Sequence, residues 1–173
     1  AICCDHPPYK RKELCADYKA NREKQPDAMH EQFRRVKERL AADGFLLWSV
    51  PGFEADDVIA TAVDYARREE EPLAVTIASN DKDLMQLVND GANVRIFSTA
   101  TGDIIDEAGV FAKWGVPPSK LLDALALQGD SSDNVPGIPK VGPKTAAKLI
   151  ADFGDVEGVL SCWQRIGQQK LSE

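Results

Sequence analysis

The feature that most constrains this fold is an alternation of short apolar segments with longer amphipathic ones through the first part of the chain. The apolar segments, each short enough for a β-strand, are residues 1–4, 45–50, 73–78 and 94–97. The segments with apolar residues at helical spacing are 29–43, 55–68 and 82–88. This order predicts an α/β domain in which helices cover both faces of a mostly parallel sheet. Residues 73–78 are apolar enough to predict a strand that is fully buried.

The second part of the chain has a different pattern. From Glu107 onward the pattern is helical, Gly and Pro punctuate it, and no strand is predicted. We therefore expect two parts, an α/β domain over residues 1–106 and an all-helical lobe over residues 107–173. A chain of 173 residues with 43% hydrophobic residues is long enough for one sizeable core and a small second lobe.

Composition excludes several classes of protein. No stretch reaches the roughly 18 apolar residues of a membrane span, and no leader resembles a signal peptide, so we expect a cytoplasmic protein with no membrane partner. The four cysteines lack CxxC spacing, which argues against a zinc site or a disulfide framework. A formal net charge of −7 argues at first against a nucleic-acid partner, but the basic residues are clustered and the acids are grouped elsewhere.

Four groups of acidic residues follow predicted strands or begin helices. They are Asp5; Glu54, Asp56 and Asp57; Asp81 and Asp83; and Asp130 and Asp133. In an open α/β sheet, ligands bind outside the carboxyl ends of the strands. Many carboxylates at one site need cations to stay ionised, and hard divalent metals prefer oxygen ligands. Helix capping is the alternative explanation, and for any single group it accounts for the acids as well as metal binding does.

Two basic segments suggest contact with phosphate. Residues 18–22, Tyr-Lys-Ala-Asn-Arg, combine an aromatic ring with cations, which suits stacking on an unpaired base and gripping phosphates. A solvated run of charges is the commoner explanation for such a segment. Residues 137–145 approach the P-loop pattern, but Pro143 removes a backbone N–H that a P-loop needs. A glycine hairpin before a helix that starts at Pro143 fits better, with Lys140, Lys144 and Lys148 beside it.

Four longer motifs have the order and spacing of a known family. They are Gly52-Phe53-Glu54-Ala55-Asp56-Asp57, Asn80-Asp81-Lys82-Asp83-Leu84, Gly129-Asp130-Ser131-Ser132-Asp133-Asn134 and Gly142-Pro143-Lys144-Thr145-Ala146-Ala147. Together they resemble the 5′ nuclease family, which includes flap endonucleases and the amino-terminal domain of bacterial DNA polymerase I. The resemblance covers nearly the whole chain.

The resemblance implies a PIN-like α/β domain followed by a helix-hairpin-helix lobe. It also implies a monomer that hydrolyses 5′ ends or 5′ flaps of DNA with two Mg²⁺ or Mn²⁺ ions, and K⁺ held at the hairpin. The implied metal ligands are Asp5, Glu54, Asp56, Asp57, Asp81, Asp83, Asp130 and Asp133. The implied catalytic residues on the substrate side are Tyr18, Lys19 and Arg22. The implied DNA-binding residues are Arg11, Gly137, Lys140, Gly142, Lys144, Thr145 and Lys148.

Other functions stay open at this stage. A non-catalytic DNA-binding module would need only the hairpin and the basic loop, and a catalytically impaired fragment of a DNA polymerase I is a further alternative. The family's first strand, which ends in a metal-binding Asp, has no counterpart before Ala1. We therefore expect an upstream strand and helix in the gene product. Without them, the 173-residue chain is expected to be weakly stable and nearly inactive.

Overall fold

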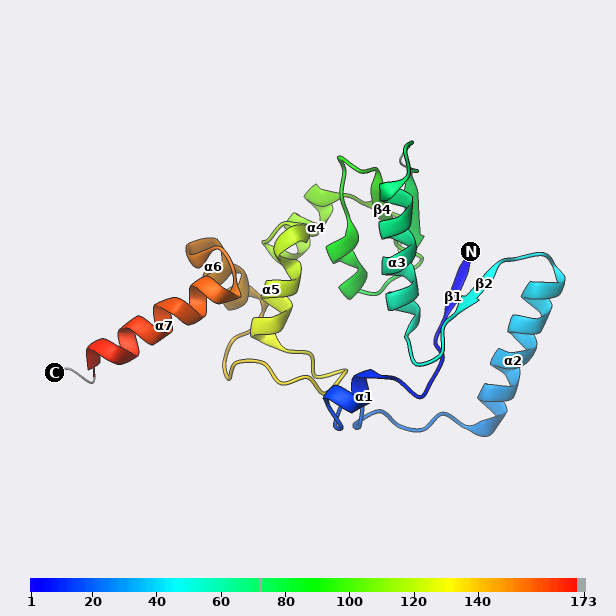
Figure 1. Ribbon diagram of the computed structural model, residues 1–173, viewed down its shortest axis with the longest axis horizontal. Coiled ribbons are helices and arrows are strands. Elements are labelled where there is room, and N and C mark those ends of the chain that lie inside the picture. The colour runs from blue at the N-terminus through cyan, green and yellow to red at the C-terminus, as the bar shows by residue number, and fades with distance from the viewer. Residues whose placement is uncertain (72, 171–173) are drawn as a thin grey trace. The chain divides into compact units, whose positions relative to one another are not determined.

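The computed structural model describes residues 1–71 and 73–170, which form two compact units (Figure 1). The first unit comprises residues 1–65 together with the short segment 132–134, and the second comprises residues 66–131 and 135–170. Each unit contains a small sheet with parallel strands. None of the described helices is long and apolar enough to cross a membrane.

The first unit contains a two-stranded parallel sheet. Its elements are β1 (Ile2–Cys4), α1 (Arg11–Leu14), α2 (Asp27–Ala42), β2 (Leu47–Ser49) and α3 (Ala55–Arg68), which continues into the second unit. Ile2 pairs with Leu47, and Cys4 pairs with Ser49. The bounds of α3 are those predicted from its apolar spacing, and the long polar segment before α2 contains one short helix, α1.

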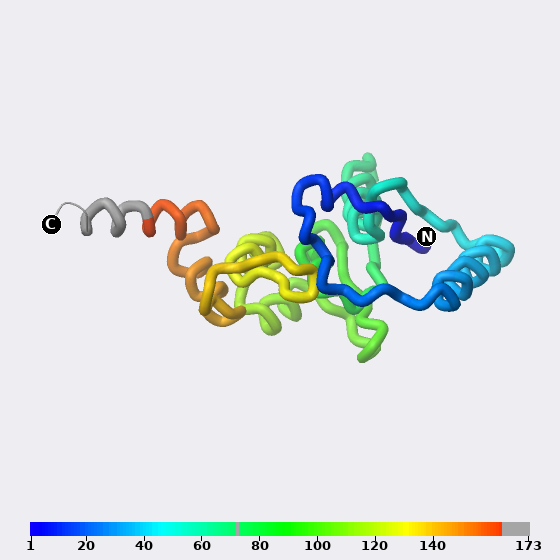
Figure 2. Tube along the Cα trace, turned by 90° about the horizontal axis from the view of Figure 1, so that it is seen from below, coloured from blue at the N-terminus to red at the C-terminus, as the bar shows by residue number. Residues whose placement is uncertain are grey.

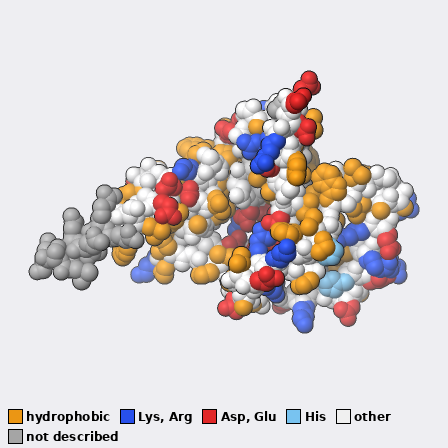
Figure 3. Space-filling model, in the orientation of Figure 1, with side chains coloured by type: hydrophobic (Ala, Val, Ile, Leu, Met, Phe, Trp, Pro, Cys, Tyr) orange, Lys and Arg blue, Asp and Glu red, His pale blue; other side chains and the backbone are white. Residues whose placement is uncertain are grey.

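The apolar face predicted for α2 is less buried than expected. The helix forms, but it has no fully buried residue, and Phe33 and Val36 remain half exposed. Ion pairs between side chains three or four residues apart join its turns, which supports a helix that buries little apolar surface. Figure 3 shows both signs of charge along α2 and hydrophobic side chains on the visible surface over β2. The helical periodicity therefore predicted helix α2 but not how little of its apolar face is buried.

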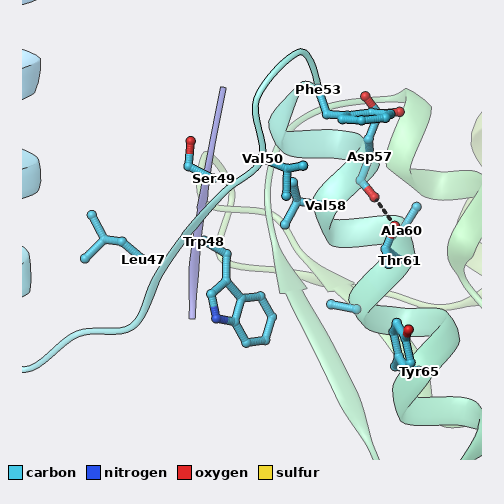
Figure 4. A pocket seen from close by; sticks show the side chains of 11 residues that line it. Leu47, Trp48, Ser49, Val50, Phe53, Asp57, Val58, Ala60, Thr61 and Tyr65 are labelled. Carbon is cyan, nitrogen blue, oxygen red and sulfur yellow. Dashed lines mark hydrogen bonds between the residues drawn. The ribbon is translucent and has the colours of Figure 1, made fainter. Parts of the chain in front are cut away.

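An apolar pocket of about 870 Å³ lies between β2 and α3 in the first unit. Trp48 and Val50 line it from the strand side, and Val58 and Tyr65 line it from the helix (Figure 4). Its one acidic side chain, Asp57, is hydrogen-bonded elsewhere, as described below. This lining offers apolar contact rather than the grouped charges that phosphate chemistry requires.

The second unit contains a three-stranded sheet and the remaining helices. Its elements are β3 (Val75–Ala78), the 3₁₀ helix η1 (Asp83–Leu87), β4 (Val94–Phe97), β5 (Ile104–Ile105), α4 (Glu107–Trp114), α5 (Pro118–Gln128), α6 (Pro143–Phe153) and α7 (Val156–Lys170). β3 and β4 are parallel, and β5 is antiparallel to β4. The sequence did not predict β5, and the helix predicted over 82–88 is the 3₁₀ helix η1, a form that is frequent in short connecting segments.

The core of the second unit lies under β4 and α5. Val94 and Ile96 are fully buried, while Arg95 and Phe97 point to the other face, as the two-residue period of a strand requires. Leu121 and Leu127 of α5 are also buried. The prediction that residues 73–78 are buried throughout is wrong, because only Ile77 of β3 is buried in the chain as described.

Glycine and proline set the ends of the helices in this unit. Asp106 accepts a hydrogen bond from the Gly109 N–H and caps α4, which ends at Gly115 in the left-handed region. Pro143 occupies the first turn of α6, as predicted, and Ala146 and Ile150 are buried behind it. These helix starts place the exposed lysines discussed below.

Candidate functional site

Two carboxylates hold the start of α3 in the first unit. Asp5 follows β1 and accepts hydrogen bonds from the Ala55 N–H at 2.7 Å and from the Tyr9 hydroxyl at 2.9 Å. Asp57, in the first turn of α3, accepts from the Glu54 N–H at 3.0 Å. The capping alternative is therefore correct for one oxygen of each of these carboxylates. Capping does not account for all their contacts, because both Asp57 oxygens also bind Arg11, as described below.

The Glu54 side chain is buried among donors from Arg11 and from the basic loop, which comprises residues 18–22. Only 4% of the residue is exposed, and burying a carboxylate to this extent without hydrogen-bond partners would cost free energy. The Lys19 Nζ lies 2.5 Å from Oε1, and the Tyr18 hydroxyl donates to Oε2 at 2.7 Å. Arg11 adds a longer contact of 3.3 Å to Oε2. The basic loop is therefore folded onto the acid rather than simply solvated.

Arg11 binds Asp57 in a bidentate manner. Its Nη1 and Nη2 atoms donate to the two carboxylate oxygens, both at 2.6 Å. This hydrogen bonding from Arg11 holds the pKa of Asp57 below its ordinary value, and burial opposes the shift only in part. The carboxylate of Asp57 is therefore ionised near neutral pH. It is available to hold either this arginine or another cation.

Asp133 completes the cluster from a segment distant in sequence. Its carboxylate contacts Arg22, accepts from the Tyr18 hydroxyl at 3.1 Å, and lies 3.8 Å from the Lys19 Nζ. Burial, followed by the hydrogen bond to Glu54, raises the pKa of Tyr18 well above its ordinary value. Tyr18 therefore remains a protonated donor near neutral pH. Only 7% of it is exposed, and the expectation that its ring stacks on a base stays a prediction.

The first unit thus brings together many of the predicted site residues in one hydrogen-bonded cluster, which we call the acid–base cluster. Its members are Arg11, Tyr18, Lys19, Arg22, Glu54, Asp57 and Asp133. Asp5 lies beside the cluster, where it accepts from the Ala55 N–H and from Tyr9. Asp56 lies half-buried in the first turn of α3. Among the residues the structure describes, no three His, Cys, Asp or Glu side chains lie close enough to hold a metal ion.

The second unit contains the other predicted acids. Asp81 follows β3, where it accepts a hydrogen bond from the Asp83 N–H at 2.9 Å and begins η1. Asp130 lies just beyond α5, 2.8 Å from the Nζ of Lys82. Burial alone would lower the pKa of Lys82, but the hydrogen bond and charge of Asp130 outweigh it and raise the pKa above its ordinary value. The carboxylates of Asp81 and Asp130 therefore each have a local partner within the unit.

Sequence reasoning did not identify Tyr9 and Lys82 as site residues. Burial and the hydrogen bond to Asp5 raise the pKa of Tyr9 to about 12, and its ring lies 5.5 Å from the Lys19 Nζ. Tyr9 stands four residues after Asp5, and Lys82 stands between two predicted acids. That proximity in sequence was the available signal. An isolated Tyr or Lys in a polar segment is too common to be selected by it alone.

The hairpin before α6 presents lysines at the surface of the second unit. Lys140 has a left-handed backbone with φ of 68°, and Lys144 and Lys148 lie one turn apart on α6. All three lysines and Thr145 are exposed. Gly137 lies instead at the base of the hairpin, where an added Cβ would stand 2.2 Å from backbone atoms of Gln128. The positions of the lysines suit contact with an extended anionic surface.

Two family models match this chain along its whole length. Residues 1–115 match the N-terminal resolvase-like domain of 5′-3′ exonucleases. The chain belongs to the 5′-3′ exonuclease family. Residues 116–173 match the C-terminal SAM fold of the same family. The resemblance drawn from the four sequence motifs is thereby confirmed.

Named relatives of this 5′-3′ exonuclease family chain are considerably longer. DNA polymerase I of Rhizobium leguminosarum is 46% identical over 164 residues, which are 94% of this chain and 16% of the relative. The 5′-3′ exonuclease of Aquifex aeolicus is 41% identical over 160 residues, 92% of this chain and 54% of the relative. The chain therefore spans about half or less of the length of these two proteins.

Solved structures of bacteriophage T5 proteins share the fold. The T5 5′-exonuclease with bound divalent metal ions (zinc) has a TM-score of 0.75 at 26% identity, over 91% of this chain and 61% of the other. The T5 flap endonuclease in a pseudo-enzyme-product complex with DNA and metal ions has a TM-score of 0.75 at 25% identity, with the same coverage. The catalytic core of Rad2 with DNA substrate, 18% identical with a TM-score of 0.58, shares the fold alone.

Proposed function

We propose that this chain forms the nuclease part of a 5′-3′ exonuclease or flap endonuclease that hydrolyses DNA phosphodiesters with divalent metal ions. The acid–base cluster is the observation that carries the proposal. It joins Glu54, Asp57 and Asp133 to the cationic side chains of Arg11, Lys19 and Arg22, and its carboxylates come from regions matched by both family models. We further propose that the protein acts on DNA as a cytoplasmic monomer. In this proposal residues 1–106 form the PIN-like nuclease domain, and residues 107–173 form a helix-hairpin-helix DNA-binding lobe that also supplies Asp130 and Asp133 to the metal site.

The chemistry of the predicted ligands fits hard divalent cations. All eight are carboxylates, which are the oxygen ligands that Mg²⁺ and Mn²⁺ prefer. Three of them now hold cationic side chains, namely Glu54 with Lys19, Asp57 with Arg11 and Asp133 with Arg22. These are sites where a positive charge is already stabilised, so the proposal requires the side chains to yield to two metal ions. Bound divalent metals would activate a water molecule and offset charge on the scissile phosphate.

The basic side chains have a second task in this proposal. Released from the carboxylates, Lys19 and Arg22 would face the phosphate and neutralise the charge that develops on it during cleavage. Tyr18 keeps its proton near neutral pH and acts as a hydrogen-bond donor. Lys140, Lys144 and Lys148 would grip the duplex backbone without reading its sequence. The carbonyls of the hairpin around Gly137 and Gly142 are proposed to hold K⁺.

The test is cleavage of a labelled 5′-flap duplex in Mg²⁺ by Asp130→Asn and Asp133→Asn variants. Each substitution should lower the rate by about a hundredfold or more, because it removes a charged ligand while preserving shape. Binding of the same DNA in Ca²⁺ should change little. Asp103→Asn, at an exposed turn, is the matched control and should cut at the parent rate.

A non-catalytic DNA-binding module remains a second candidate, favoured by the exposed lysines at the hairpin. It predicts that the parent protein binds the flap duplex but does not cut it in Mg²⁺ or Mn²⁺. Rates for Asp130→Asn and Asp133→Asn within about tenfold of a cleaving parent would contradict the metal assignment.

A further inference from the structure

Two left-handed residues face each other in the first unit. Lys19 has a φ of 56° and Asn134 a φ of 58°, and the Lys19 N–H donates to the carbonyl of Asp133, the residue before Asn134, at 2.9 Å. Residues other than glycine rarely adopt this conformation, and they persist in it only where surrounding contacts hold them. In Figures 1 and 2 the yellow loop that includes residues 132–134 lies beside the blue segment that includes residues 17–22.

The Asn134 side chain makes the contact that closes this arrangement. Its Nδ2 donates to the carbonyl of Asp17 at 2.8 Å. The same carbonyl accepts the Ala20 N–H at 3.0 Å, the hydrogen bond that closes the turn from Asp17 to Ala20. On the other side of the segment, the Arg22 Nε donates to the Ser132 carbonyl at 3.4 Å. Asn134 is thus bonded to the atom that defines the turn.

The turn from Asp17 to Ala20 carries the side chains proposed to act on the phosphate. Tyr18 and Lys19 are its two central residues, and both reach Glu54. A shift of the Asp17 carbonyl would rotate these residues away from their present positions. The Asn134 side chain contacts the backbone of the turn, at the Asp17 carbonyl, rather than the side chains of Tyr18 and Lys19.

We infer that Asn134 is a positioning residue, which sets Lys19 and Tyr18 by holding the Asp17 carbonyl. The inference rests on the proposed nuclease function. The position requires two properties at once, tolerance of the left-handed region and a side-chain N–H donor. Asparagine has both, aspartate lacks the donor and glycine lacks the side chain. Asn134→Asp and Asn134→Gly therefore remove the contact while preserving the backbone conformation.

The first experiment is independent of catalysis. Hydrogen exchange measured by mass spectrometry on the full chain should show the amides of residues 18–22 exchanging about fivefold faster in both Asn134 variants, the effect of losing one net hydrogen bond. Asn93 has the same left-handed backbone, with φ of 53°, but lies in the second unit, so Asn93→Asp is the matched control. Exchange at residues 18–22 equal to that of the control would overturn the inference.

The second experiment separates positioning from general stability. In flap cleavage, Asn134→Asp and Asn134→Gly should lower kcat about tenfold while KM stays within about twofold, because the hairpin lysines that grip the duplex are unchanged. On a Lys19→Ala background, Asn134→Asp should lower kcat by less than about twofold, since residues acting as a unit are not additive. A full tenfold further loss on that background, or parental kcat in both single variants, would overturn the inference. Absence of cleavage by the parent would refute the proposed function, and hydrogen exchange would still decide the role of Asn134.

Discussion

Replacing Gly137 with Ala is expected to destabilise the second unit, because the base of the hairpin has no room for a Cβ. A Cβ at this position would stand 2.2 Å from both the carbonyl carbon and the oxygen of Gln128, and 2.4 Å from the Gly129 nitrogen. All three are backbone atoms, so no side chain can turn aside. Ordinary contact begins near 3.4 Å, and the two backbone segments must therefore separate by about 1.2 Å.

The magnitude follows from the contacts that this separation disturbs. Overpacking a tight contact costs roughly 1–3 kcal/mol, and the upper end applies where only backbone can move. The loop beyond Gly129 is closed by the reciprocal hydrogen bonds of Asp130 and Val135, at 2.9 and 2.8 Å, and each is worth about 1 kcal/mol net. The expected loss is therefore about 3–5 kcal/mol, which lowers the melting temperature by roughly 10 °C for a chain of this size.

Urea unfolding followed by circular dichroism measures this loss, and Gly142→Ala is its matched control. Gly142 belongs to the same hairpin, has an ordinary negative φ of −99°, and has nothing within 4 Å of an added Cβ. As a helix N-cap it should lose less than about 1 kcal/mol on substitution by Ala. If the free energies of unfolding of Gly137→Ala and Gly142→Ala agree within about 0.5 kcal/mol, the close approach of Gly137 to the backbone of Gln128 does not determine the stability of the hairpin.

Three further outcomes are expected. Replacing the hairpin lysines together should flatten the dependence of log Kobs on log salt by roughly 0.9 per lost phosphate contact, measured by fluorescence anisotropy, and an unchanged slope would contradict their role. Leu121→Ala should cost about 2–5 kcal/mol in urea unfolding because Leu121 is fully buried, whereas its neighbour Leu122, 62% exposed, should lose little; equal losses would contradict the described core. The Gly158 N–H lowers the pKa of Asp155 below 3.8, so its capping of α7 stabilises the fold above that pH and is lost as the pH falls through the lowered pKa. The melting temperatures of the parent and Asp155→Ala should therefore differ at pH 7 and converge as the pH falls through the lowered pKa, and a constant difference would refute the assignment.

The sequence was sufficient where one local pattern determined the outcome. The apolar spacing of residues 55–68 predicted α3 at its observed bounds, and Pro143 marked the start of α6. The strand at Val94–Phe97 was likewise found because its alternation is complete. Burial was predicted less well. An apolar side chain shows that a face should be covered, but Phe33 and Leu73 remain exposed because covering depends on neighbours that periodicity does not specify.

The candidate site shows a similar division. The motifs selected the acids, but no local rule could assign Arg11 to Asp57 or Lys82 to Asp130, since these partners are far apart in sequence. Asp5 was selected as a metal ligand, and the structure also gives it a capping bond to Ala55. The metal role of these carboxylates stays a prediction. Their pairing with cations is a property of tertiary structure alone.

The contacts of Asp133 also have a consequence for the order of folding. Tyr18 and Asp133 are separated by 115 positions, and closing a loop of that length costs about 4 kcal/mol or more in chain entropy. Such contacts form only after nearer ones have reduced the freedom of the chain, so the acid–base cluster should assemble late. On the ribosome, Tyr18 emerges long before Asp133 exists. A growing chain therefore lacks this grouping of charges, and the cluster becomes complete only when most of the sequence has been synthesised and folded.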